Sequence, residues 1–93
     1  MSQREESSRT VMIANRQGLH ARPAAEFVKR AKSYEAQIFV IKEEVEVNGK
    51  SILGLMMLAA ECGSELTIRA DGRDAGAAID DLCALIAGGF GEE

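Results

Sequence analysis

The spacing of apolar residues along the chain predicts two amphipathic α-helices. In each, apolar residues recur at positions i, i+3, i+4 and i+7, which places them on one face of a helix. The face of the first helix consists of Ala24, Phe27, Val28 and Ala31. The face of the second consists of Ile79, Leu82, Cys83 and Ile86. The first helix is expected to end near Lys32, and the second at Gly88 and Gly89.

Four shorter segments have the pattern of β-strands, with apolar and polar residues in alternation or in short apolar runs between turn residues. They span residues 9–14, 37–42, 45–47 and 65–70. Between the third and fourth strands, residues 52–60 are predicted to form a short helix that Ser51 caps and Gly63 ends. Asp74 is placed to cap the last helix.

The predicted order of elements is therefore β-α-β-β-α-β-α. Ninety-three residues are enough for one domain with one small core. We predict an α+β fold, an open-faced two-layer sandwich in which three helices cover one face of an antiparallel four-stranded sheet. The single domain spans residues 1–93, with an ordered part at about 8–90. Residues 1–7 and the two final glutamates are expected to be frayed.

Composition and charge narrow the classes of function. The net charge of −4 and the low content of aromatic residues argue against a nucleic-acid partner. No apolar run is long enough to span a bilayer and no signal peptide is apparent, so we expect a cytoplasmic protein with no membrane partner. The two cysteines lack a metal-binding or disulfide spacing. Cys83 is expected in the core and Cys62 nearer the surface.

The one histidine of the chain stands where the first long helix begins. His20 follows a turn at Gly18 and precedes Pro23, a residue that suits the first turn of a helix. The unpaired amide groups and the dipole of a helix N-terminus attract anions, phosphate in particular. Arg22 adds donors that match phosphoryl oxygens, and a neutral imidazole is a nucleophile. The residues alone leave two interpretations open, a phosphoryl-accepting histidine or a helix cap beside a solvated arginine.

Two segments resemble the motifs of one known family. Gly18-Leu-His-Ala-Arg-Pro-Ala24 resembles the active-site signature of HPr, the histidine-containing phosphocarrier of the bacterial phosphotransferase system. Asn48-Gly-Lys-Ser-Ile-Leu-Gly-Leu-Met56 resembles that family's second motif, around a regulatory serine. The spacing between His20 and Ser51 also fits, and the resemblance runs from about residue 9 to residue 91. Gln17 is a departure, because the family often has a shorter polar residue there.

The resemblance implies a stoichiometric phosphoryl carrier rather than an enzyme. His20 would accept the group from phospho-Enzyme I, at Nδ1, and pass it to an EIIA-type domain. Arg22 and the amide groups of Ala21 and Arg22 would hold the phosphoryl oxygens, and neither a metal nor another cofactor is implied. Ser51 would be the substrate of an HPr kinase/phosphorylase in branches with serine control, whereas its local pattern requires only a helix cap. Both a sugar-transport branch and a nitrogen-regulatory branch stay open.

The segment 52–58 is unusually apolar for one short helix. Leu55 and Leu58 have the spacing of core residues. The resemblance implies that the rest of this helix forms a docking surface together with the His20 loop, through Ile52, Leu53, Gly54 and Met56. The alternative is that the segment only enlarges the core. The rival class for the whole chain is a small regulatory or ligand-binding α+β module without phosphotransfer. For the phosphocarrier we expect a monomer.

Overall fold

The computed structural model describes residues 5–92 and has the predicted order of elements, with one short 3₁₀ turn added at the end. The strands are β1 (Glu6–Met12), β2 (Gln37–Lys42), β3 (Val45–Asn48) and β4 (Glu65–Asp71). The helices are α1 (Ala21–Ala31), α2 (Ile52–Met57) and α3 (Ala75–Ala87), followed by the turn η1 (Gly89–Gly91).

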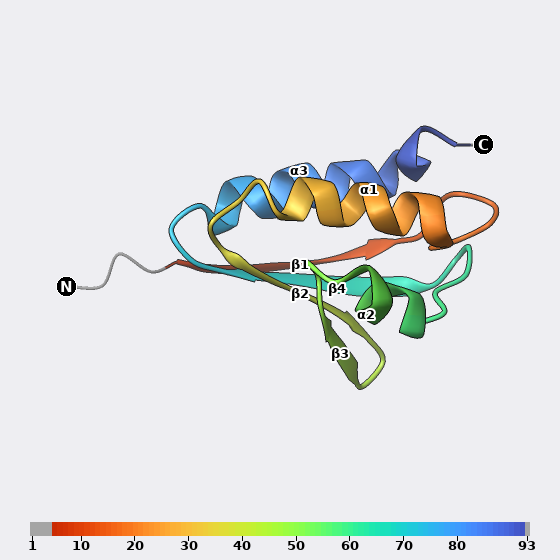
Figure 1. Cartoon of the computed structure of the whole chain (residues 1–93), viewed down its shortest axis with the longest axis horizontal. Helices are drawn as coiled ribbons and strands as arrows, with labels where there is room; N and C mark the ends of the chain where they lie inside the picture. Colours follow the sequence, from red (N-terminus) through yellow and green to blue (C-terminus); the bar gives the residue numbers. More distant parts are fainter. Residues whose placement is uncertain (1–4, 93) are drawn as a thin grey trace.

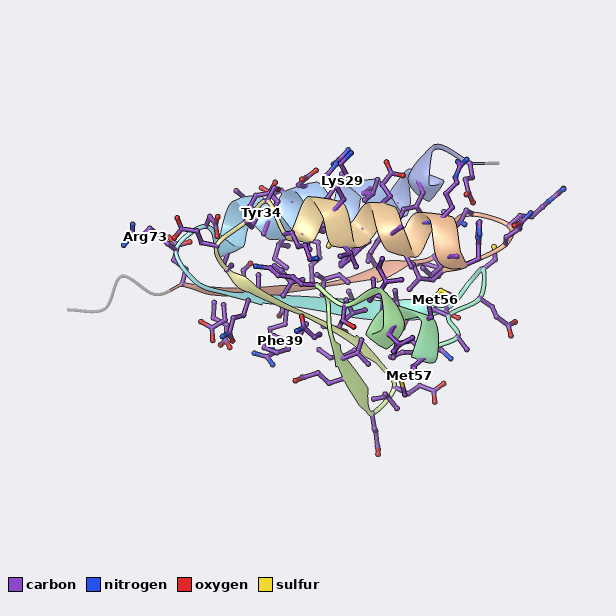
Figure 2. All side chains as sticks on the ribbon, viewed as in Figure 1. Lys29, Tyr34, Phe39, Met56, Met57 and Arg73 are labelled. Atoms are coloured by element: carbon purple, nitrogen blue, oxygen red, sulfur yellow. The ribbon has the colours of Figure 1, made fainter. Side chains whose placement is uncertain are left out.

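The four strands form one antiparallel sheet in the order β1-β4-β2-β3. Helices α1 and α3 lie side by side over one face of this sheet (Figure 1). The short helix α2 packs against α1 and against the edge strand β3. On the opposite, open face, Phe39 extends away from the helices (Figure 2), and the Arg69 guanidinium lies 4.3 Å from the centre of its ring. The predicted open-faced α+β sandwich is therefore confirmed.

The core lies between the sheet and the helices. Both predicted apolar helix faces are buried throughout, and β4 contributes alternate residues from the sheet. Leu55 and Leu58 of the apolar segment are buried as predicted. Cys83 is buried and Cys62 is exposed, also as predicted. The pattern of apolar positions thus identified the faces that meet in the core.

Several boundaries differ from the prediction. Strand β1 begins at Glu6, within the segment expected to be frayed, because the backbone there pairs with β4 whatever the polarity of its side chains. Residues 1–4 and Glu93 lie outside the described residues. Strand β1 ends at Met12 instead of residue 14. Helix α2 ends at Met57 rather than residue 60, because Ala59 has a φ of +50°, which an α-helix cannot contain.

Asp74 does not act as the simple helix cap that the sequence predicted. It stands at the N-cap position of α3, but within residues 5–92 its carboxylate makes no cap bond to that helix. It accepts hydrogen bonds from the backbone amides of Glu35, at 2.9 Å, and Ala36, at 2.8 Å. These bonds, that of Glu35 foremost, hold the pKa of Asp74 below its usual value. Asp74 therefore ties the segment between α1 and β2 to the start of α3.

Asp74→Ala is expected to lower the thermal midpoint at neutral pH, because two backbone amides lose their acceptor. A carboxylate whose pKa is depressed in the folded state stabilises the fold above its unfolded pKa. That contribution is lost as the pH falls through the folded value. The midpoint difference between wild type and Asp74→Ala, measured by calorimetry, should therefore be largest at neutral pH and shrink below about pH 4. The exposed Glu44→Ala is the control, and a difference independent of pH would contradict a role for the charge.

Candidate functional site

The loop before α1 is fixed by close contact with the segment before β4. The Leu19 amide donates to the carbonyl oxygen of Ala60 at 2.9 Å, and the Leu19 side chain is buried. Gly18 has a φ of +70°, and a Cβ atom there would lie 2.5 Å from the same carbonyl oxygen. A side chain at position 18 would be excluded both by this contact and by the backbone conformation. Gly18 thus allows the packing that places His20 at the start of α1.

His20 is the N-cap residue of α1, with extended backbone angles (φ −81°, ψ −172°). Its carbonyl oxygen accepts the amide of Ala24 at 3.0 Å, so the backbone alone begins the helix. Within the described residues its side chain makes no cap bond, and about a third of that side chain (34%) is exposed. His20 therefore caps the helix through its backbone only, and its side chain is left for other contacts. The amides of Ala21 and Arg22 belong to the first turn, where a helix provides no carbonyl partner.

A carboxylate from the C-terminal end completes the site. Both carboxylate oxygens of Glu92 lie 3.1 Å from Nε2 of His20, and one lies 3.4 Å from Nε of Arg22. The Glu92 side chain is 14% exposed, whereas that of Arg22 is 71% exposed. The hydrogen bond with His20, followed by that with Asn15, holds the pKa of Glu92 below its usual value. Arg22 therefore stands beside the imidazole, as predicted, with a shared carboxylate partner.

Asn15 holds this carboxylate in place. Its side chain is buried, and Nδ2 donates to the Gly18 carbonyl at 2.7 Å and to Glu92 Oε1 at 2.9 Å. Gln17 lines the same shallow hollow, together with His20, Arg22 and Glu92. Figure 1 shows the C-terminal end of the chain beside the loop that leads into α1. The site thus combines segments from the two ends of the sequence.

Sequence reasoning missed both Asn15 and Glu92. The final glutamates were expected to be loose, and for Glu92 this is wrong. The sequence feature that could have predicted an ordered C-terminal end is Phe90, the one large apolar residue in the segment 88–93. Its side chain is buried in the core and anchors the turn that carries Glu92. An apolar anchor of this kind indicates a docked tail rather than a free one.

Comparison with known proteins now decides the family. The family described as "PTS HPr component phosphorylation site" matches residues 7–88. The chain belongs to the HPr family. It is similar to phosphocarrier protein HPr of Treponema pallidum (strain Nichols), with 42% identity over 85 residues, which cover 91% of this chain and 97% of that protein. It is also similar to phosphocarrier protein NPr of Shewanella violacea, with 39% identity over 84 residues, which cover 90% and 92%.

The fold agrees with this assignment. The crystal structure of HPr-C-His from Thermoanaerobacter tengcongensis superposes with a TM-score of 0.90 at 45% identity, and the match covers 94% of this chain and 98% of that one. The resemblance found in the two sequence motifs is therefore confirmed. The function that follows is that of a phosphocarrier in the phosphotransferase system.

The second HPr motif forms the start of α2. The Oγ atom of Ser51 accepts the amide of Gly54 at 3.0 Å, so Ser51 is the helix cap that the sequence predicted. A Cβ atom at Gly54 would lie 3.3 Å from Cβ of Val47, which shows a close approach of α2 to β3. Gly54 therefore has a structural reason to be glycine, whereas its part in docking stays a prediction.

Much of the apolar segment remains at the surface. The exposed fractions are 45% for Ile52, 74% for Leu53, 40% for Met56 and 75% for Met57. Both methionines extend from α2 below α1 in Figure 2. The alternative that this segment only enlarges the core is therefore wrong for these four residues.

None of the helices in residues 5–92 has the length and apolar character needed to cross a bilayer. The same residues contain no group of three or more His, Cys, Asp or Glu side chains arranged to hold a metal ion.

Proposed function

We propose that this HPr-family phosphocarrier receives a phosphoryl group on His20 from phospho-Enzyme I and passes it to an EIIA-type domain. The observation that carries the proposal is the imidazole at the start of α1, partly exposed and beside Arg22. A ring nitrogen attacks phosphorus, the new N–P bond forms, and the N–P bond of the donor breaks. Arg22 and the amides of Ala21 and Arg22 hold the phosphoryl oxygens, and no metal takes part.

The shallow site suits a carrier. Its lining of Gln17, His20, Arg22 and Glu92 leaves the imidazole open to the histidine of a partner protein. A deep site with many donors would bind the phosphoryl group more tightly and would lower its transfer potential. The protein would act as a cytoplasmic monomer. It would gain and lose one phosphoryl group in each cycle, as a stoichiometric carrier and not as an enzyme.

The test is a two-step relay with purified proteins. Phosphoenolpyruvate and Enzyme I should add one acid-labile phosphate, detected by intact mass before and after acid treatment. Addition of an EIIA-type protein should then remove it. The relay is run with one EIIA from a sugar system and one from a nitrogen-regulatory system, because relatives include both HPr and NPr proteins. An acid-stable phosphate, or none, would contradict the proposal.

We also propose that an HPr kinase/phosphorylase modifies Ser51 and that Ile52, Leu53 and Met56 contact Enzyme I. Ser51 is partly exposed, and the three apolar side chains beside it are exposed. A phosphate at a helix N-terminus is compatible with the fold. It would place negative charge at the edge of the surface on which the partner docks.

Ser51→Asp is therefore expected to weaken binding of Enzyme I without lowering stability. The carboxylate is favourable at the start of α2, but it meets acidic groups of the partner at short range. Calorimetric titration at two salt concentrations measures the effect, which should diminish as salt rises. Ser33→Asp, beyond the far end of α1, is the matched control. Unchanged affinity at low salt would mean that Ser51 serves only as a helix cap.

A further inference from the structure

We propose that the open face of the sheet binds a basic segment of a protein partner, and that a hollow at Ile41 receives one of its lysine or arginine side chains. This face lies on the side of the sheet opposite α1 and α3 (Figure 1). It is separate from the site of His20, because the hollow at Ile41 and the hollow around His20 have no lining residue in common.

The hollow lies over a row of three side chains that crosses the sheet. The strand register aligns Thr10 of β1, Thr67 of β4 and Ile41 of β2. Thr67 and Ile41 alternate with the buried Ile68 and Val40, so they point to the open face. The hydroxyl groups of Thr10 and Thr67 lie 3.1 Å apart and share a hydrogen bond. The hollow has a volume of about 410 Å³, and the rest of its lining consists of Lys42, Glu43, Ser64 and Glu65.

The free charges at this hollow are negative. Glu43 and Glu65 are exposed, and within residues 5–92 neither carboxylate takes part in an ion pair. Lys42 also lines the hollow, but its Nζ lies 3.4 Å from the carbonyl oxygen of Leu58, at the end of α2. This contact directs the ammonium away from the open face, because adjacent side chains of a strand point to opposite faces. An incoming cation would therefore meet two carboxylates that lack an ion-pair partner among the described residues.

The same face already holds one guanidinium in the proposed way. The guanidinium of Arg69 lies 4.3 Å from the centre of the Phe39 ring, which extends from the open face (Figure 2). Its nitrogens lie 3.2 Å from Glu46 and 3.5 Å from Glu6. An apolar side chain below the cation and carboxylates beside it thus hold an arginine on this sheet. The hollow at Ile41 offers the same combination one row along the strands.

The composition of the face favours a peptide over other occupants. Within the described strands, the register places on it four carboxylates and one cation, namely Glu6, Glu46, Glu65, Asp71 and Arg69. This excess of negative charge repels nucleic acid and anionic lipid and attracts basic groups. Met12 on the same face is 53% exposed, and Phe39 and Ile41 are partly exposed. A metal ion or a polyamine would leave these apolar side chains uncovered, whereas a basic segment with interspersed apolar residues would contact both groups.

The test uses two hexapeptides with blocked ends, one of alternating arginine and leucine and one of alternating glutamate and leucine. Each is titrated at low salt into the ¹⁵N-labelled full chain. The basic peptide should shift amide resonances of β1, β2 and β4 around the hollow, and the acidic peptide should leave them unchanged. Glu43→Gln combined with Glu65→Gln should weaken binding of the basic peptide roughly fivefold. The matched control combines Glu26→Gln with Glu35→Gln, in and after α1, and changes the net charge equally.

The outcomes separate this surface from general charge attraction. Weaker binding confined to the variant of Glu43 and Glu65, with unchanged thermal midpoints, would support the inference. Equal weakening in the control would attribute binding to net charge and overturn it, as would shifts centred on the apolar residues of α2. Shifts on the open face when the free protein alone is concentrated would assign this face to a second copy and also overturn it. His20→Ala should bind the basic peptide like wild type, so a failure of phosphoryl transfer would leave the inference standing.

Discussion

His20→Ala is expected to abolish phosphoryl uptake and to leave the fold intact. The side chain is only partly buried, and α1 begins through the backbone carbonyl of residue 20, which alanine retains. No other histidine exists in the chain to replace the nucleophile. Intact mass after incubation with phosphoenolpyruvate and Enzyme I measures the effect, and the variant should show no acid-labile phosphate.

The control for this experiment is the folding of the variant itself. Circular dichroism and the thermal midpoint should stay close to those of wild type, because the backbone bond that begins α1 is retained and about a third of the His20 side chain is exposed. Labelling of His20→Ala equal to that of wild type would show that another residue accepts the group. A loss of labelling accompanied by unfolding would call for the milder His20→Gln, which keeps a polar side chain of similar length.

The sequence was informative where structure depends on neighbours in the chain. Helical spacing identified the residues of α1 and α3 that meet in the core, and alternation identified the strands. The start of α1 at residue 21 follows from local features, namely the turn at Gly18 and the early Pro23. Such features placed His20 and Arg22 at the start of the helix, and the resemblance of two motifs to the HPr family made them the candidate site.

The sequence was least informative where contacts join distant segments. Glu92 bonds to a residue 72 positions away, and no periodic pattern reports such a pairing. Asp74 shows the same limit. Its local pattern predicted a cap on α3, but amides 38 and 39 positions earlier in the chain attract its carboxylate instead. Tertiary competition for a hydrogen-bond acceptor cannot be read from the neighbours of that acceptor in the sequence.

Local sequence features and contacts between distant segments both shape the candidate site, which lies at one end of the molecule. The loop before α1, the segment after α2 and the C-terminal turn converge there, joined by the bonds of Leu19 to Ala60 and of Asn15 to Glu92. The motif supplies His20 and Arg22, and a distant segment supplies the carboxylate that contacts both side chains. A site assembled in this way depends on the whole fold although its recognisable signature is short.

Arg22→Ala is expected to slow phosphoryl transfer strongly while changing stability little. The side chain is 71% exposed, and exposed ion pairs contribute about 0–1 kcal/mol to folding. A charge-assisted contact to a phosphoryl group is worth roughly 1.5–3 kcal/mol, which corresponds to a rate about ten- to a hundredfold lower. Single-turnover transfer from phospho-Enzyme I and the thermal midpoint are measured on the same preparations.

Two comparisons make the result specific. Arg22→Lys keeps the charge but loses the planar set of donors, so its rate should lie between those of wild type and Arg22→Ala. Arg73→Ala removes a positive charge from the opposite end of the molecule (Figure 2) and should transfer at the wild-type rate. A large fall in midpoint with an unchanged rate would show that Arg22 is structural. Equal slowing in Arg22→Ala and Arg73→Ala would attribute the effect to net charge rather than to a contact at the phosphoryl group.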